Sequence, residues 1–232
     1  MAILRRGLLL AALALPCAAV LAQAPPSTSV RVEADAVVFD GRIDEPSVRE
    51  FLRLAQDPAI HRLVIRSPGG LVAPALDMAD AVVAHGLDVD VDQACLSSCA
   101  NYVFPAGRRK SLSGPGAVGW HGNMAHVLYR AQQGEEHWSD GLLAQARALA
   151  RREDAFFRRI GVDGFVCWFG KIVPYDVDAF YTLSVADMAG FGIRDVSVRD
   201  VAVPAGIERI VVDWSTLEAV RPAVQLQEPD AP

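Results

Sequence analysis

The sequence predicts an α/β fold with a largely parallel sheet, and three observations support this. Short β-rich runs alternate with helical runs along most of the chain. The order strand, tight turn, helix occurs at 63–83 and again at 87–107. No repeat, low-complexity linker or abrupt change of composition divides the chain. Since alternating strands and helices build parallel sheets covered by helices, we expect one α/β domain.

The first elements follow from residue patterns. Residues 29–32 and 36–39 are β-rich, and 46–55 carries apolar residues at helical spacing. Residues 63–65 form a buried-type strand that stops at Ser67-Pro68-Gly69-Gly70, where paired glycines allow a tight turn and a close approach to the backbone. A helix is predicted from Leu71 to Val83, and Gly86 ends it.

The later elements repeat this order. Residues 87–91 begin a strand, and CLSSC at 95–99 stands where that strand gives way to a helix running through Phe104 to Gly107. Residues 117–120 are the next predicted strand, with His121 directly at its end. A long helix rich in Ala, Arg and Leu is predicted over 142–159.

The ends of the chain and its charge bound the function. Arg5 and Arg6 precede an apolar run that ends in small residues, which predicts a signal peptide over 1–22, cleaved after Ala22, and a periplasmic or secreted protein. The single domain then covers 23–232, with a flexible lead-in at 23–28 and a frayed tail at 227–232. A net charge of −6 and a pI near 5.3 argue against nucleic acid as a partner.

The mature chain keeps three cysteines, an odd number for an oxidising compartment. Cys95 and Cys99 could form a local disulfide if the chain turns sharply between them, which depends on their Cα separation. The alternative is two small buried residues, and Cys167 has no assigned partner. No histidine or cysteine pair stands at metal spacing, so we predict no metal and no cofactor.

Three strand ends carry chemically useful groups. Paired glycines can offer N–H groups to an oxyanion, CLSSC offers a hydroxyl at a helix start, and His121 offers a base. In an α/β sheet such groups gather at the carboxyl ends of the strands. Each has a structural alternative, namely a turn, a helix cap and a structural histidine.

At this point the chain resembles the proteolytic subunit of Clp protease, within the crotonase superfamily, from about residue 41 to residue 195. IRSPGG at 65–70 is similar to the family's strand followed by Ser-Pro-Gly-Gly. Ser98 precedes the glycine of AGRR (106–109) by nine residues, as the family's nucleophile does, and GWHG (119–122) places His121 like the family's histidine. LSVADMAGFGIRD (183–195) is similar to the family's closing segment.

The resemblance implies a spiral of parallel strands flanked by helices and a serine peptidase. It makes Ser98 the nucleophile, His121 the general base, and Asp178 the third triad member, with Asp176 competing. It places the oxyanion on the N–H groups of Gly69 or Gly70 and of Cys99. Peptides or unfolded proteins are the implied substrates, and the family's assembly implies a homo-oligomer. A secreted address implies no ATPase partner.

Departures from the family keep alternatives open. Ser97 is a rival nucleophile, because this chain has Cys-Leu-Ser before Ser98 and Cys-Ala after it. The family's His-Gln-Pro is here His-Gly-Asn, which leaves the substrate-strand contacts after the histidine in doubt. Signal peptide peptidases of this fold use a lysine base, and the chain's two lysines are Lys110 and Lys171, but His121 is preferred. An esterase or thioesterase, or a catalytically inactive binding or assembly module, would fit the same fold.

Overall fold

In the computed structural model, the described residues are 28–113, 116–135, 137–199 and 205–221. The predicted signal peptide (1–22), the predicted tail (227–232) and the lead-in up to residue 27 lie outside them.

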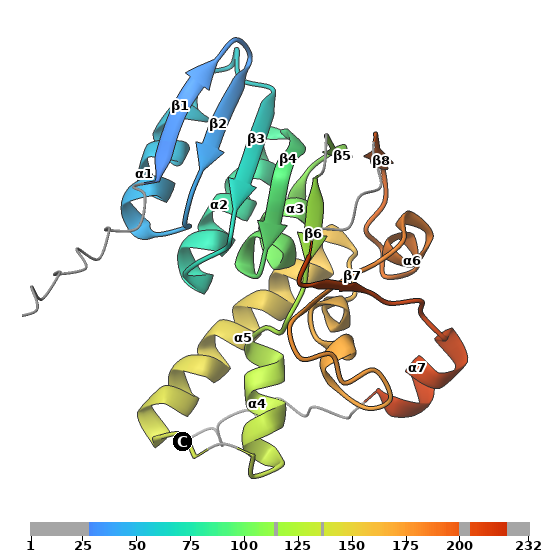
Figure 1. Ribbon diagram of the computed structural model, residues 1–232. Helices are drawn as coiled ribbons and strands as arrows, with labels where there is room; N and C mark the ends of the chain where they lie inside the picture. Colours follow the sequence, from blue (N-terminus) through green and yellow to red (C-terminus); the bar gives the residue numbers. More distant parts are fainter. Residues whose placement is uncertain (1–27, 114–115, 136, 200–204, 222–232) are drawn as a thin grey trace, which may run out of the picture.

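The centre of the described part is a mostly parallel sheet (Figure 1). The strands lie in the order β1-β2-β3-β4-β5-β8, and β6 pairs with the distal part of β4. Only β1 and β2 are antiparallel; the other pairs of this sheet are parallel. This confirms the predicted α/β class. The strands are β1 Ser29–Glu33, β2 Ala36–Asp40, β3 Arg62–Ser67, β4 Asp88–Leu96, β5 Lys110–Leu112, β6 Ala117–Gly119 and β8 Val196–Val198.

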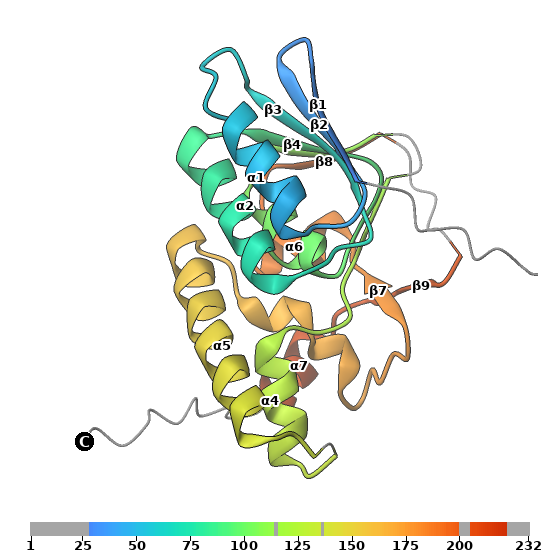
Figure 2. The same ribbon diagram turned by 90° about the vertical axis from the view of Figure 1, so that its left-hand side faces the viewer.

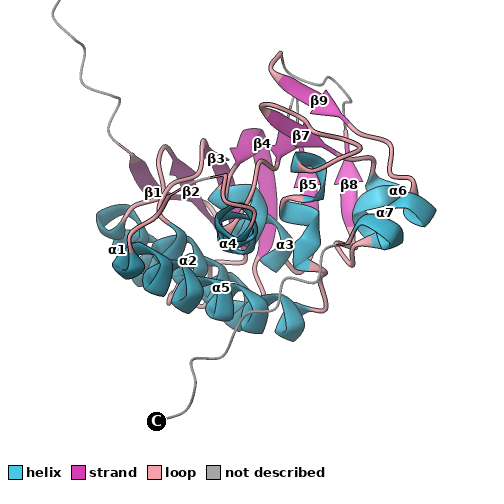
Figure 3. Cartoon of the chain, turned by 90° about the horizontal axis from the view of Figure 1, so that it is seen from below, coloured by secondary structure: helices cyan, strands magenta, loops and turns pink. Residues whose placement is uncertain are grey.

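Helices cover one face of this sheet, as Figure 3 shows from below. Helices α1 (Glu45–Leu54), α2 (Val72–His85) and α5 (Asp140–Ile160) lie side by side in that layer. Alternate strand residues point into the core between the layers; Leu63, Ile65, Val89 and Val91 are completely buried. The sequence predicts these elements because their apolar residues follow the strand or helix period over enough residues to be recognised.

A second, two-stranded sheet lies on the opposite side of the main sheet from these helices. It pairs β7 (Phe180–Thr182) with β9 (Ile207–Arg209) in parallel. Trp120, directly after β6, forms an antiparallel bridge with Tyr181 of β7, with both N···O distances 2.9 Å. This bridge brings His121 next to Phe180.

A helical hairpin extends from the body of the molecule (Figure 2). It consists of α4 (Met124–Gln132) and the first half of α5, and a small apolar cluster around Leu128, Ala146 and Ala150 joins them. The sequence does not predict α4, β5, β7, β8 or β9. The four strands have three residues each and carry no readable period, whereas the equally short β6 is predicted at 117–120. Further helices of the described fold are α3 (Phe104–Ala106), α6 (Val185–Gly190), α7 (Trp214–Val220) and the short 3-10 helices η2 (Gly164–Cys167) and η3 (Phe169–Lys171). None of the described helices is long and apolar enough to span a bilayer.

Candidate active site

The site is built on the sharp turn at the end of β4. Ser97 follows the strand with φ of +55°, in the left-handed region that L-residues rarely adopt. The chain then enters a π-helical turn over Cys99–Val103. A disulfide joins Cys95 to Cys99, whose Cα atoms are 5.2 Å apart. The sharp turn on which this disulfide depended is therefore present, and the bond encloses Ser97 and Ser98.

Gly69 lets the preceding strand end approach this turn. It has φ of +90°, and a Cβ atom at this position would lie 2.5 Å from the Leu96 carbonyl oxygen and 2.7 Å from the Ser97 Cβ. Both distances are shorter than non-bonded carbon contacts allow. Any larger residue would therefore displace the turn that carries Ser97.

His121 faces Ser97. Its Nε2 lies 2.7 Å from the Ser97 Oγ, and the side chain of His121 is exposed at the surface. The Ser97 N–H donates to the Gly119 carbonyl at 3.0 Å, so strand β6 is held directly beside the turn. The two groups that acyl transfer needs, a hydroxyl and an imidazole, are thus within hydrogen-bonding distance.

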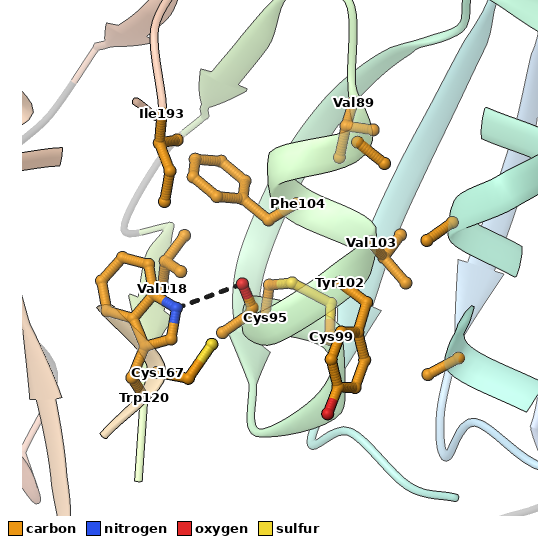
Figure 4. Packing of buried hydrophobic residues seen from close by; sticks show 14 of the residues in the cluster. Val89, Cys95, Cys99, Tyr102, Val103, Phe104, Val118, Trp120, Cys167 and Ile193 are labelled. Atoms are coloured by element: carbon orange, nitrogen blue, oxygen red, sulfur yellow. Dashed lines mark hydrogen bonds between the residues drawn. A yellow bond between two sulfur atoms is a disulfide. The ribbon is translucent and has the colours of Figure 1, made fainter. Parts of the chain in front are cut away.

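Two side chains attach the strand carrying His121 to the helix after the turn. The Trp120 Nε1 donates to the Ala100 carbonyl at 3.2 Å, and the Asn101 Nδ2 donates to the Gly122 carbonyl at 2.8 Å. Figure 4 shows Trp120 against this helix, next to the Cys95–Cys99 disulfide. Residues on both sides of His121 are therefore fixed relative to Ser97.

Ser98 occupies a different environment. Its side chain is buried, and its Oγ donates to the Gly70 carbonyl at 2.9 Å. The expected pairing of Ser98 with His121 is absent from the structure, and the rival Ser97 takes that place. The reason is local geometry: Ser98 already has right-handed helical dihedrals, so its side chain is turned away from that of Ser97.

The predicted oxyanion donors are partly occupied. The Gly69 N–H donates to the Ser67 Oγ at 3.0 Å. Among the described residues, the N–H groups of Gly70, Ser98 and Cys99 have no hydrogen-bond acceptor. Gly70 pairs with Ile43 in a parallel bridge, in which the hydrogen bonds of Ile43 go to Gly69 and Leu71. The N–H and C=O of Gly70 therefore point to the other side of the strand, toward the serine turn.

The surroundings of His121 favour its neutral form. Desolvation lowers the pKa of His121 below its usual 6.5, and the positive charge of Lys171 lowers it further. The ring of Phe180 lies 4.6 Å from the imidazole, centroid to centroid. A neutral imidazole with its proton on Nδ1 can accept the Ser97 proton at Nε2.

The expected triad carboxylate does not reach this imidazole. Among the described residues no hydrogen bond joins His121 to a carboxylate, Asp176 and Asp178 included. Instead, Asp178 presents its main-chain carbonyl to the Lys171 Nζ at 2.7 Å. Both aspartates line a surface hollow of about 520 Å³ together with Phe180.

Glu153 is a buried carboxylate that the sequence does not reveal, and it contacts two elements next to the site. Glu153 of α5 is 1 % exposed; it accepts a hydrogen bond from the Tyr102 hydroxyl and one from the Met124 N–H, at 3.1 Å. Burial raises the pKa of Glu153 to about 7. It lies in a helix rich in charged residues, so no local pattern distinguishes it from its solvated neighbours.

The remaining predicted residues lie elsewhere. Lys110 is buried in β5 and donates to the Gly107 carbonyl at 2.8 Å. Cys167 is a buried free thiol, and burial raises its pKa well above the usual value. Within the described ranges, no group of three His, Cys, Asp or Glu side chains is arranged to hold a metal ion.

Comparison with known proteins gives distant structural similarity only. No protein family and no curated protein matches the sequence. The structure is similar to a ClpP1 mutant from Listeria monocytogenes (14 % identity, TM-score 0.45, 72 % of this chain and 92 % of that chain). It is also similar to the ClpP protease catalytic domain from Plasmodium falciparum (14 %, 0.45, 73 % and 87 %) and to methylmalonyl CoA decarboxylase (8 %, 0.32, 41 % and 48 %). We therefore infer the chemistry of this chain from the residues of its own site.

Proposed function

We propose that this protein is a serine hydrolase in which Ser97 is the nucleophile and His121 the general base. The observation that carries the proposal is the 2.7 Å contact between the Ser97 Oγ and the His121 Nε2 at a left-handed turn between a strand and a helix. Left-handed residues other than glycine cost about 1–3 kcal/mol and persist where the surrounding structure enforces them, often at active sites.

The geometry supports acyl transfer by the following steps. The Ser97 Oγ attacks a carbonyl carbon while the His121 Nε2 takes the hydroxyl proton. The negative charge that develops on the carbonyl oxygen is stabilised by the N–H groups of Gly70 and Ser98, which have no acceptor among the described residues. The imidazolium then gives its proton to the leaving group, and an acyl-serine remains. A water molecule, deprotonated by the same imidazole, releases the acid and restores Ser97.

A peptidase acting in the periplasm is the form of this activity that we favour. The motif resemblance to Clp proteolytic subunits favours a peptide bond over an ester or thioester. A disulfide directly under the nucleophile suits an oxidising compartment, because such bonds are rare in the cytosol. The predicted signal peptide agrees with this address.

Labelling with a fluorophosphonate probe tests the proposal, because the probe reacts with activated serines. We expect the wild type to be labelled, Ser97→Ala to lose labelling and His121→Gln to lose it as well. Ser98→Ala is the matched control: it should retain labelling, since the substitution removes only the side-chain hydrogen bond to the Gly70 carbonyl and keeps the N–H of residue 98. It should cost about 1 kcal/mol in the free energy of unfolding.

The outcomes separate the alternatives. A wild type that is not labelled would favour the inactive binding or assembly module. Labelling lost in Ser98→Ala but kept in Ser97→Ala would return the nucleophile to Ser98. If labelling behaves as expected, digestion of a peptide library beside a panel of p-nitrophenyl esters distinguishes a peptidase from an esterase.

A further inference from the structure

Lys171 makes an unusual set of contacts close to the proposed site. Its ammonium donates to three consecutive main-chain carbonyls, those of Val177, Asp178 (2.7 Å) and Ala179 (3.3 Å). An ammonium has three protons, so these contacts use all of its donors. The Lys171 ammonium therefore holds the main chain of the segment 177–179 in place.

That segment leads directly to the histidine. The next residue is Phe180, whose ring packs at 4.6 Å from the imidazole of His121, with an angle of 51° between the ring planes. Tyr181 then holds the other side through its bridge to Trp120. The three fixed carbonyls, the aromatic ring and the histidine thus form one continuous contact chain.

Among the described residues, the imidazole has no hydrogen-bonding partner other than Ser97. Its Nε2 faces Ser97, and no carboxylate is hydrogen-bonded to the ring. In a Ser-His-Asp triad the carboxylate fixes the orientation and tautomer of the imidazole and stabilises its charged form. Here the charge that acts on the imidazole is the positive one of Lys171, which disfavours the imidazolium.

We propose that Lys171 is a positioning residue that orients His121 through the segment 177–179 and Phe180, a role that a triad gives to a carboxylate. The inference rests on the proposed function for its catalytic consequence. Asp178 then contributes its main-chain carbonyl, not its carboxylate. The reaction proceeds with a serine–histidine dyad.

The first test is an NMR titration of the His121 ring, which needs no activity. His121 is one of five histidines, so His121→Gln assigns its signal. Other groups around this region are His126, Arg130, Asp176 and Asp178. We expect Lys171→Met to raise the His121 pKa toward 6.5 and to change the ring-current shift from Phe180. Lys110→Met removes the other lysine charge and should leave the His121 titration as in the wild type.

The second test compares substitutions by kinetics, using the probe-labelling rate or the best library peptide. We expect Lys171→Met to lower kcat by about 10- to 100-fold with a smaller effect on KM, because a misplaced base costs about that much. Lys171→Arg keeps the charge and should recover part of the rate. Asp178→Asn should stay within about 3-fold of the wild type, whereas loss of a true triad aspartate costs about 10⁴-fold.

The outcomes distinguish this inference from the proposed function. A rate that collapses in Asp178→Asn and survives in Lys171→Met would overturn the inference while the hydrolase stands. An inactive wild type would overturn the hydrolase, and the NMR titration would still test the link between Lys171 and His121. An unchanged His121 pKa and ring-current shift in folded Lys171→Met would refute that link.

Discussion

The site depends on two adjacent serines that have different environments. Ser97 sits in a left-handed conformation with its hydroxyl toward His121, whereas Ser98 is buried and bonds to Gly70. A shift of one residue turns a side chain by about 100° in a helical segment. The motif CLSSC cannot specify which serine faces the base, because both are the same residue type on either side of the turn.

The pH dependence of the reaction follows from the surroundings of His121. The neutral imidazole is the base, so the rate constant rises with pH as the ring loses its proton. Desolvation and Lys171 lower the His121 pKa, so we expect the pH at which the labelling rate is half its maximum to lie below 6.5. His126 has a pKa of about 4 and should not shape the curve near neutrality.

This profile is measured as the second-order rate constant of probe labelling between pH 4.5 and about 8, with labelling of the Ser98→Ala variant as a parallel series. A midpoint above pH 7 would contradict the assignment, because it would require a carboxylate that stabilises the imidazolium.

The Cys95–Cys99 disulfide braces the junction of β4 with the helix that follows it. It closes a short loop, with a sequence separation of 4, around the left-handed Ser97. Chain-entropy estimates give about 2 kcal/mol for a loop of this size. The bond also limits how far the turn can relax toward an unstrained conformation.

We therefore expect the double substitution Cys95→Ala/Cys99→Ala to lower the free energy of unfolding by about 2 kcal/mol. It should also slow probe labelling of the molecules that remain folded, because the turn that carries Ser97 can then relax. Urea denaturation and labelling rates of the folded protein measure the two effects. Dithiothreitol should reproduce both in the wild type and leave the double variant unchanged. Equal labelling rates with and without the bond would show that other contacts alone hold the turn.

How well the sequence predicts these elements depends on their apolar patterns and on the motifs beside them. Helices α2 and α5 carry long apolar patterns, and their predicted bounds lie close to the observed ones, while the short β3 and β6 are marked by the motifs that follow them. Strand β7 has three residues, and its partner β9 lies far along the chain, so its position beside His121 was not predictable. The third site residue escapes prediction for another reason. Order along the chain selects Asp178, whereas the contacts of Lys171 with carbonyls six to eight residues further on depend on how the intervening loop folds back.

Glu153 connects three elements that support the site from different parts of the chain. It lies on α5, accepts a hydrogen bond from Tyr102 of the helix after the nucleophile, and accepts another from Met124 at the start of α4. Asn123, the N-cap of α4, lies two residues after His121. A buried carboxylate with donors from two elements fixes both of them relative to α5.

Burial makes this connection sensitive to pH. The pKa of Glu153 is about 7 in the folded chain and close to 4.5 in the unfolded chain. Below pH 4.5 the group is protonated in both states. As the pH rises from 4.5 to about 7, the unfolded state ionises first, so this group's contribution to stability falls, by about 3 kcal/mol in total.

Glu153→Gln removes this proton-linked loss, so the variant should gain stability relative to the wild type as pH rises from 4.5 to 7. His126, with its pKa lowered to about 4, acts in the opposite sense over an overlapping range, but it is present in both proteins and cancels in the difference. Urea unfolding at pH 4.5, 5.5, 6.5 and about 7.5 gives the two curves. Parallel curves would show that Glu153 keeps an ordinary pKa, and its role as a buried link between α5, α4 and the nucleophile helix would then have to be abandoned.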